Sequence, residues 1–200
     1  MSSNSKPFLL ALFLIVCGVF LQAQTSFKLK YNNSVVYAGI EVGSKGVKMS
    51  VIEIGKNAQS RGAFNILKDS SVNTDFISFN SPSFEATLNG MSGLYSTLVN
   101  RYRIDPKFVY TVVSSGVKQQ AEKEQKTDWI TNLVDSFKTK INEPDREVDI
   151  VGALEEARLS HLGIVPEARR YNTFLIDIGS GNTRAVIFQM ATQKILNYSM

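Results

Sequence analysis

The feature that most constrains the fold is a short pattern that occurs twice, near the two ends of the chain. An acidic residue between apolar residues is followed by glycine and serine, in GIEVGSK at residues 39–45 and in LIDIGSGNT at residues 175–183. The segments on both sides of each glycine turn are rich in apolar and β-branched residues. Each copy therefore predicts a β-hairpin, with its acidic residue near the end of the first strand.

The segments between the two hairpins predict helices and strands in alternation. Strands flank the first turn at residues 35–42 and 47–54, and the second at residues 174–178 and 183–188. The other expected segments are a strand at 63–67, a loop at 69–84, a helix at 84–102, a strand at 108–113, helices at 128–141 and 154–162, and strands at 148–151 and 195–198. This order predicts an α/β fold with a mixed sheet.

Two segments carry a more specific expectation. FVYTVV at residues 108–113 is a continuous run of strand-forming residues, which is typical of a strand covered on both faces. The helix at residues 128–141 has its apolar side chains on one stripe, which predicts packing against the core. Asp128 is a candidate cap for its N-terminus.

The first 23 residues have the composition of a secretory signal peptide. A positively charged start precedes an almost entirely apolar run at residues 7–21, and small or polar residues follow, so we expect cleavage after Ala23 and export to the periplasm or the medium. The apolar run is shorter than the roughly 20 residues that span a bilayer comfortably. The alternative is that residues 7–21 remain as a membrane anchor.

Two domains are expected after the signal peptide (residues 1–23). Residues 35–145 would form the first, and residues 146–200 would begin a second domain of the same kind. The second hairpin lies at the end of the chain, so the helices that would complete that repeat are expected to be missing.

Composition narrows the range of partners. The net charge is +4, from 22 basic and 18 acidic residues, and no run of Lys and Arg is dense enough to predict nucleic-acid binding. The mild positive excess favours anionic ligands. Cys17 lies within the signal peptide, so no disulfide is expected in the mature part, and the single His161 argues against a histidine-rich zinc site.

The two turns are the best candidates for a ligand site. Glycine permits a positive φ and a close approach of the backbone, and successive N–H groups with Ser or Thr hydroxyls bind anions such as phosphate. The expected phosphate-binding residues of the turns are Gly43, Ser44, Lys45, Gly179, Ser180, Gly181, Asn182 and Thr183. The preceding acids, Glu41 and Asp177, suit a Mg²⁺ ion beside the phosphates. A plain hairpin turn also favours Gly, Ser and Asn, but two matching turns in one chain favour the phosphate site.

The paired turns resemble the two phosphate loops of the actin, sugar-kinase and heat-shock-chaperone superfamily, which has a ribonuclease H-like fold. EEARL at residues 155–159, followed by Leu162 and Gly163, resembles the segment before the second loop of Ppx/GppA exopolyphosphatases. Residues 103–118 resemble that family's strand leading into a Thr/Ser-rich loop with a basic residue. The resemblance extends over nearly the whole mature chain and concerns the N-terminal portion of the family.

The resemblance implies a phosphoanhydride hydrolase that acts in the cleft between two domains, with Mg²⁺, on polyphosphate or a guanosine polyphosphate. It implies that Glu156 is the general base for the attacking water and that Lys118 stands where the family grips the phosphate chain with an arginine. Three departures concern the metal and the water: Glu41 replaces an aspartate, Arg184 replaces an acidic residue, and Gly-Ser-Gly replaces three glycines in the second turn. Hydrolysis depends on these positions more than binding does.

Two alternatives stay open. A secreted apyrase-like nucleoside phosphate hydrolase would suit export, and SSGVK at residues 114–118 loosely resembles the Thr-Ala-Gly-Met-Arg loop of those enzymes, although the glutamine of their second loop is absent. A module that binds phosphate or nucleotide ligands without catalysis would suit Glu41 and Arg184. A homodimer is a further possibility, and no membrane contact is expected beyond the leader segment.

Overall fold

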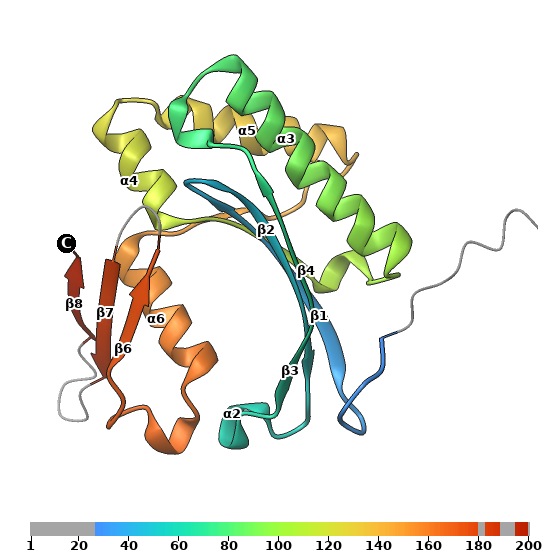
Figure 1. Cartoon of the computed structure of the whole chain (residues 1–200), viewed down its shortest axis with the longest axis vertical. Coiled ribbons are helices and arrows are strands. Elements are labelled where there is room, and N and C mark those ends of the chain that lie inside the picture. The colour runs from blue at the N-terminus through green and yellow to red at the C-terminus, as the bar shows by residue number, and fades with distance from the viewer. Residues whose placement is uncertain (1–26, 180–182, 189–194, 200) are drawn as a thin grey trace, which may run out of the picture.

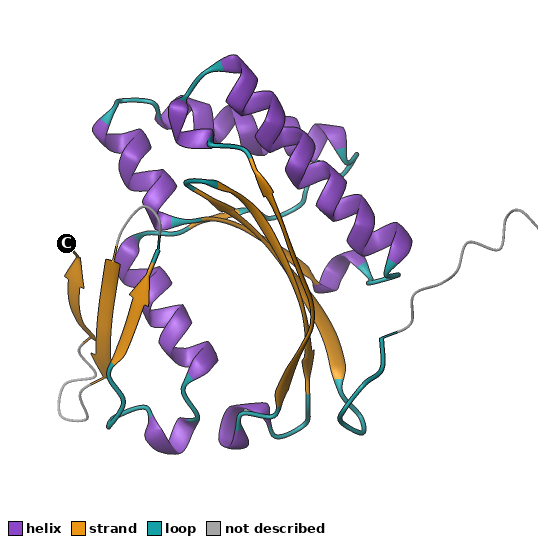
Figure 2. Ribbon diagram, viewed as in Figure 1, coloured by secondary structure: helices purple, strands orange, loops and turns teal. Residues whose placement is uncertain are grey.

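The computed structural model describes residues 27–179, 183–188 and 195–199, which form two β-sheets and the helices that pack on them (Figures 1 and 2). The predicted signal peptide lies outside these residues. Within the described ranges, no helix has both the length and the apolar character needed to cross a bilayer. The predicted α/β class is confirmed.

The first sheet has five strands in the order β3-β2-β1-β4-β5. The strands are β1 (Val35–Gly43), β2 (Gly46–Ile54), β3 (Phe64–Asn73), β4 (Val109–Val113) and β5 (Asp149–Ile150). β2 is antiparallel to both β1 and β3, whereas β4 is parallel to both β1 and β5. The sheet is therefore mixed, as predicted.

Helices cover one face of this sheet, and the main core lies between them and the strands (Figure 1). α3 (Ser81–Ser96) packs on β1, β2 and α5 (Thr127–Lys140). Alternate strand residues such as Ile40, Val42 and Met49 are buried beneath the helices, because side chains of a strand point to opposite faces in turn. The other helical segments before β5 are α2 (Ala58–Arg61), α4 (Ser115–Lys123), a π-helical turn at Thr97–Arg101 and 3₁₀ turns at Phe76–Ser78 and Pro106–Phe108.

Helix α6 (Ala153–Ile164) leads from the first sheet to a second one, with a 3₁₀ turn at Glu167–Arg169 in between. The second sheet has the order β6-β7-β8, and its neighbouring strands are antiparallel. Its strands are β6 (Leu175–Ile178), β7 (Thr183–Phe188) and β8 (Ile195–Ser199). α6 packs on this sheet and lies between the two sheets in Figure 1. The predicted second hairpin and its added strand are thus present.

Two predictions about loops are wrong. The expected loop at residues 69–84 contains the end of β3 and the start of α3. β3 is an edge strand, where exposed Ser and Asp side chains are tolerated because pairing with β2 supplies the backbone hydrogen bonds. The Thr/Ser-rich loop expected before Lys118 is instead the first turn of α4.

Two finer predictions are also wrong. Asp128 lies in the first turn of α5, and Lys126 is the N-cap residue, without a side-chain cap. β4 is covered on one face only, since Tyr110 on the other face is 58% exposed. In addition, β5 lies beyond the expected domain boundary at residue 145, yet it pairs with β4 and belongs to the first sheet.

Candidate functional site

The carboxyl ends of three parallel strands meet at one edge of the first sheet. Val42 of β1 pairs with Val113 of β4, and Val113 pairs with Ile150 of β5. The first glycine turn follows β1, helix α4 follows β4, and helix α6 follows β5, so all three connections start at this edge. Open α/β sheets characteristically bind ligands in the crevice outside the carboxyl ends of their strands.

A pocket of about 130 Å³ lies at this edge, between the first turn, the starts of α4 and α6, and the β6–β7 hairpin. Its lining residues are Glu41, Gly43, Ser44, Lys45, Gly46, Lys48, Ser71, Val72, Asn73, Ser114, Gly116, Glu156, Gly179 and Arg184. Its volume is that of about four molecules of liquid water, and it is well below the roughly 300–1,000 Å³ of pockets for drug-sized ligands. A phosphate group fits within this volume.

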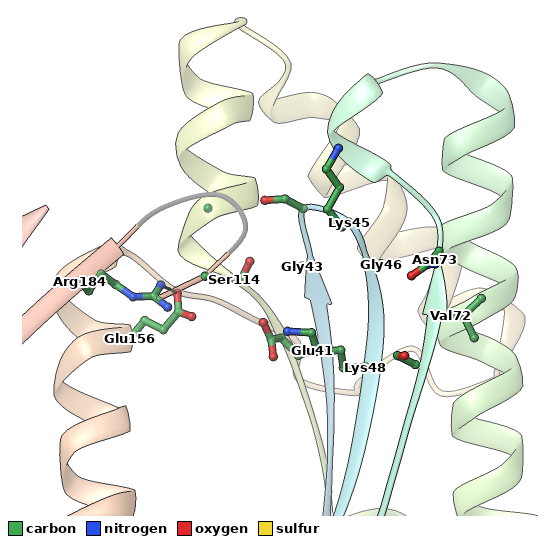
Figure 3. A pocket seen from close by; sticks show the side chains of 14 residues that line it. Glu41, Gly43, Lys45, Gly46, Lys48, Val72, Asn73, Ser114, Glu156 and Arg184 are labelled. Atoms are coloured by element: carbon green, nitrogen blue, oxygen red, sulfur yellow. Dashed lines mark ion pairs between the residues drawn. The ribbon is translucent and has the colours of Figure 1, made fainter. Parts of the chain in front are cut away.

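The first glycine turn forms one wall of the pocket (Figure 3). Gly43 pairs with Gly46 across the hairpin, which leaves Ser44 and Lys45 as the turn residues. None of these four described residues has a left-handed φ, so the expectation of a positive φ is wrong for this turn. Gly46 is needed for close approach instead, because a Cβ there would lie 2.3 Å from the carbonyl oxygen of Val72.

Three charged side chains of the same hairpin line the pocket. Glu41 and Lys48 are direct neighbours across the hairpin, and Lys45 is in the turn. Lys45 Nζ lies 3.1 Å from Asp75 Oδ1, and hydrogen bonds from Ser78 and Lys45 lower the pKa of Asp75. Because both partners are exposed, this ion pair contributes little to stability, and Lys45 can exchange Asp75 for a ligand anion at little cost.

Glu156, the predicted general base, reaches the pocket from the first turn of α6. Its Oε2 accepts a hydrogen bond from the backbone N–H of Ser115 at 2.7 Å. Ser115 is the first residue of α4, and the first N–H groups of a helix have no partner within it and carry the positive end of the helix dipole. The Glu156 carboxylate therefore already uses one anion-binding donor at the start of α4.

Arg184 of β7 links the two predicted acidic residues of this side. Its Nη1 lies 2.5 Å from Glu156 Oε2 and donates to Ser115 Oγ at 2.7 Å, and its Nη2 lies 2.6 Å from Asp177 Oδ2. Asp177 and Arg184 are direct neighbours across the β6–β7 hairpin, and the Arg184 side chain is only 5% exposed. Figure 3 shows Arg184 and Glu156 together, across the pocket from the turn that carries Lys45. One guanidinium thus connects α4, α6 and the second sheet.

These contacts restrain the chemistry open to Glu156. A general base must come within hydrogen-bond reach of the water whose proton it takes. Oε2 already accepts the N–H of Ser115 and forms an ion pair with Arg184, so the proton would have to go to Oε1 or to a rearranged side chain. Glu156 is a pocket residue in this structure, and its role as a base stays a prediction.

The described residues do not fit a resident Mg²⁺ site. Mg²⁺ needs oxygen ligands that are free to face it. Asp177 does not line the pocket, and its carboxylate is bound by Arg184, which leaves Glu41 alone of the predicted pair. In the parts of the chain that the structure describes, no group of three or more acidic, His or Cys side chains could hold a metal.

The remaining predicted residues are placed differently. Gly179 lines the pocket, whereas Thr183, the first residue of β7, does not. Lys118 lies on α4 with its Nζ 4.0 Å from Glu122, and it is not a lining residue either. The other predicted residues of the second turn, Ser180, Gly181 and Asn182, lie outside the described residues.

Two pocket residues, Lys48 and Arg184, and the neighbouring Ser115 have roles that the sequence did not predict. Lys48 could have been found from the hairpin register, which places it opposite Glu41. The same reasoning places Arg184 opposite Asp177, but not beside Glu156. The contact of Ser115 with Glu156 joins residues that are 41 positions apart, and no local pattern signals it.

Comparison with known proteins identifies the fold. No family model matches the chain, and no curated protein matches its sequence. Solved structures do match. A Ppx/GppA family member from Aquifex aeolicus superposes with a TM-score of 0.59 at 16% identity, over 84% of this chain and 51% of that chain. The chain has the fold of the Ppx/GppA proteins.

Further structures agree with this assignment. An exopolyphosphatase from Cytophaga hutchinsonii matches with a TM-score of 0.57 at 15% identity, over 83% of this chain and 50% of that chain. An exopolyphosphatase-like protein gives a TM-score of 0.57 at 17% identity, with the same coverage. The chain spans about half the length of these Ppx/GppA-type structures. The predicted likeness is confirmed for the fold, and the ligand and chemistry are separate questions.

Proposed function

We propose that the protein binds the terminal phosphate group of a phosphoanhydride chain in this pocket, with polyphosphate as the simplest ligand. The supporting observation is that the first glycine turn, the start of α4 and the Glu156–Arg184 pair converge on one small pocket. Lys45, Lys48 and Arg184 contribute positive charge, and N–H groups at a helix start suit an anion. The Ppx/GppA and exopolyphosphatase names of proteins with this fold favour the same ligand class.

Hydrolysis is a second candidate function, because Glu156 lines the pocket. In this reaction a water oxygen would bond to the terminal phosphorus, the bond to the bridging oxygen would break, and Glu156 would take the water proton. Positioning supplies most of the catalysis in phosphoryl transfer. Since Arg184 and Ser115 hold Oε2, we expect binding to be retained and turnover to be slow.

A nucleoside is expected to add little affinity. The pocket of about 130 Å³ accommodates a phosphate group, and its described lining has no aromatic side chain on which a base could stack. We therefore expect ATP and tripolyphosphate to bind with similar affinity. An apyrase-like function would instead require much tighter binding of ATP or ADP than of tripolyphosphate.

Export is part of the proposal. The support is the charged start and apolar run within residues 1–23, which would leave Gln24 as the first residue of the mature protein. Mass spectrometry of the protein recovered from the periplasm or medium would identify the N-terminus. Recovery of uncleaved protein from the membrane fraction would favour the anchor at residues 7–21.

The main experiment measures binding and phosphate release on the same samples. Isothermal titration calorimetry would use tripolyphosphate, ATP and guanosine pentaphosphate, and a coupled assay would follow released phosphate. The variant Glu156→Gln removes a negative charge from the pocket. The adjacent Glu155→Gln is a matched control, because Glu155 pairs with Arg158 at 2.7 Å and does not line the pocket.

We expect Glu156→Gln to bind tripolyphosphate more tightly, by about two- to tenfold, since a pocket carboxylate repels phosphate. Glu155→Gln should bind as the wild type does. Phosphate release that disappears in Glu156→Gln and persists in Glu155→Gln would establish hydrolysis with Glu156 as base. Absence of binding by the folded wild-type protein to all three ligands would refute the proposal.

A further inference from the structure

We infer that Arg184 supplies the charge that a divalent cation would otherwise supply, so that the pocket binds its phosphate ligand without Mg²⁺. The inference rests on the proposed function, because it concerns the same pocket and ligand class. It starts from a mismatch at Asp177, which was expected to hold a metal ion and whose carboxylate is instead bound by the guanidinium of Arg184.

The guanidinium of Arg184 lies between the carboxylates of Glu156 and Asp177, so a metal ion could not lie between them at the same time. Arg184 Nη1 lies 2.5 Å from Glu156 Oε2, and Nη2 lies 2.6 Å from Asp177 Oδ2. A metal ion that bridged these carboxylates would occupy the position of the guanidinium. Arg184 is held there by its place opposite Asp177 in the hairpin and by a third contact, with Ser115 Oγ at 2.7 Å. An arginine fork is planar and stays charged, so this cation is permanent.

Arg184 is the least exposed of the cationic side chains that line the pocket. The lining also holds Lys45 and Lys48, but the Lys45 side chain is 67% exposed, and exposed charges are screened by water. The Arg184 side chain is 5% exposed, and a charge in such surroundings acts more strongly on a nearby anion. Without Arg184, the carboxylates of Glu156 and Asp177 would repel phosphate, and a metal ion would be needed to offset them.

The first test uses the wild-type protein alone. Tripolyphosphate binding would be measured by isothermal titration calorimetry after EDTA treatment and again with excess Mg²⁺, and Mg²⁺ alone would be titrated into metal-free protein. We expect affinity in EDTA within about threefold of that in Mg²⁺ and no heat of Mg²⁺ binding. Loss of binding in EDTA, or a stoichiometric Mg²⁺ site in the absence of phosphate, would overturn the inference.

The second test uses Arg184→Gln, with Arg158→Gln as a matched control. Arg158 also pairs with a glutamate, at 2.7 Å, but on the exposed side of α6. In EDTA, Arg184→Gln should bind tripolyphosphate about tenfold or more weakly, and Mg²⁺ should restore much of that affinity. Arg158→Gln should resemble the wild type. A folded Arg184→Gln variant that binds in EDTA as tightly as the wild type would contradict the role of Arg184.

The outcomes separate this inference from the function on which it rests. Circular dichroism would show whether Arg184→Gln is folded, and the double variant Arg184→Gln with Glu156→Gln removes the unpaired carboxylate if it is not. Binding that needs Mg²⁺ would refute the inference and leave the proposed ligand class standing. Absence of tripolyphosphate binding to the wild type, with and without Mg²⁺, would refute both.

Discussion

At the residue scale, Glu53 shows how a fully buried carboxylate is kept ionised. Its oxygens accept the backbone N–H groups of Lys30, at 2.8 and 3.0 Å, and of Tyr31, at 2.7 Å. Ser34 Oγ and Asn65 Nδ2 donate at 2.7 and 3.3 Å. Burial raises the pKa of Glu53, but these hydrogen bonds outweigh it and lower the pKa from 4.5 to about 2. Through these hydrogen bonds, Glu53 holds the segment before β1 against the end of β2.

Replacing this carboxylate should loosen that segment. We expect Glu53→Gln to lower the melting temperature at neutral pH by several degrees, since an amide cannot accept all of these hydrogen bonds. The amides of Lys30 and Tyr31 should also exchange with solvent faster. Hydrogen exchange and thermal unfolding measure both effects. Glu85→Gln, at an exposed position of α3, is the control and should change neither.

The same carboxylate predicts the acid sensitivity of the fold. Because the folded-state pKa is lower than the ordinary value of 4.5, the stability from Glu53 is fully present above about pH 4.5 and is lost as the pH falls towards 2. The wild type should lose stability over this range, and Glu53→Gln should lose less. Parallel acid unfolding curves for the two proteins would contradict this account.

At the scale of elements, the contact between β2 and β3 depends on one glycine. A Cβ at Gly46 would lie 2.3 Å from the carbonyl oxygen of Val72, a backbone atom that cannot move without shifting β3. Gly46 and Val72 both line the pocket, so the shift would also change the pocket wall.

We therefore expect Gly46→Ala to cost about 1–3 kcal/mol of folding free energy and to weaken tripolyphosphate binding. Gly39→Ala is the matched control, because nothing lies within 4 Å of a Cβ at that position of β1. The control should change stability by less than about 0.5 kcal/mol. Chemical denaturation measures both variants. Equal losses of stability in Gly46→Ala and Gly39→Ala would show that a glycine in a paired strand, rather than the close approach of β3 to Gly46, explains the effect.

At the scale of the whole molecule, the edge strand β6 of the second sheet carries a row of exposed apolar side chains. Phe174, Ile176 and Ile178 alternate along β6 and its N-terminal flank with exposed fractions of 54%, 57% and 78%. Leu175 and Asp177 lie between them and are less exposed. A row of exposed aromatic and aliphatic side chains is typical of a surface that another protein layer covers.

We expect this row of apolar side chains on β6 to promote self-association of the chain, in line with the homodimer considered from the sequence. Sedimentation velocity should show association that increases with concentration, and the double variant Ile176→Lys with Ile178→Lys should reduce it. Ile66→Lys is the control, since Ile66 is 57% exposed but lies on β3 of the first sheet. Association that survives the double variant and disappears in the control would place the contact on the first sheet.

The sequence by itself determined the local elements. Both hairpins were predictable because a glycine turn between alternating strands is encoded within about 20 residues. The acid–Gly–Ser pattern also indicated the turn at Gly43, which lines the pocket, and the resemblance of EEARL to the Ppx/GppA segment indicated Glu156, which lines it too. The polar edge strand β3 and helix α4 were missed, because their conformation depends on pairing with β2 and on the position after β4 rather than on their own composition.

Only the tertiary structure decided what the acidic residues contact. Ser115 and Arg184 are 69 positions apart, and their hydrogen bond forms because α4 and α6 start at the same sheet edge while α6 packs on β7. The charge of Arg184 was readable from the sequence, whereas its partners were not. A sequence specifies which side chains can pair, but burial and distance decide which pairs form, because electrostatic attraction is strong only at short range and away from water.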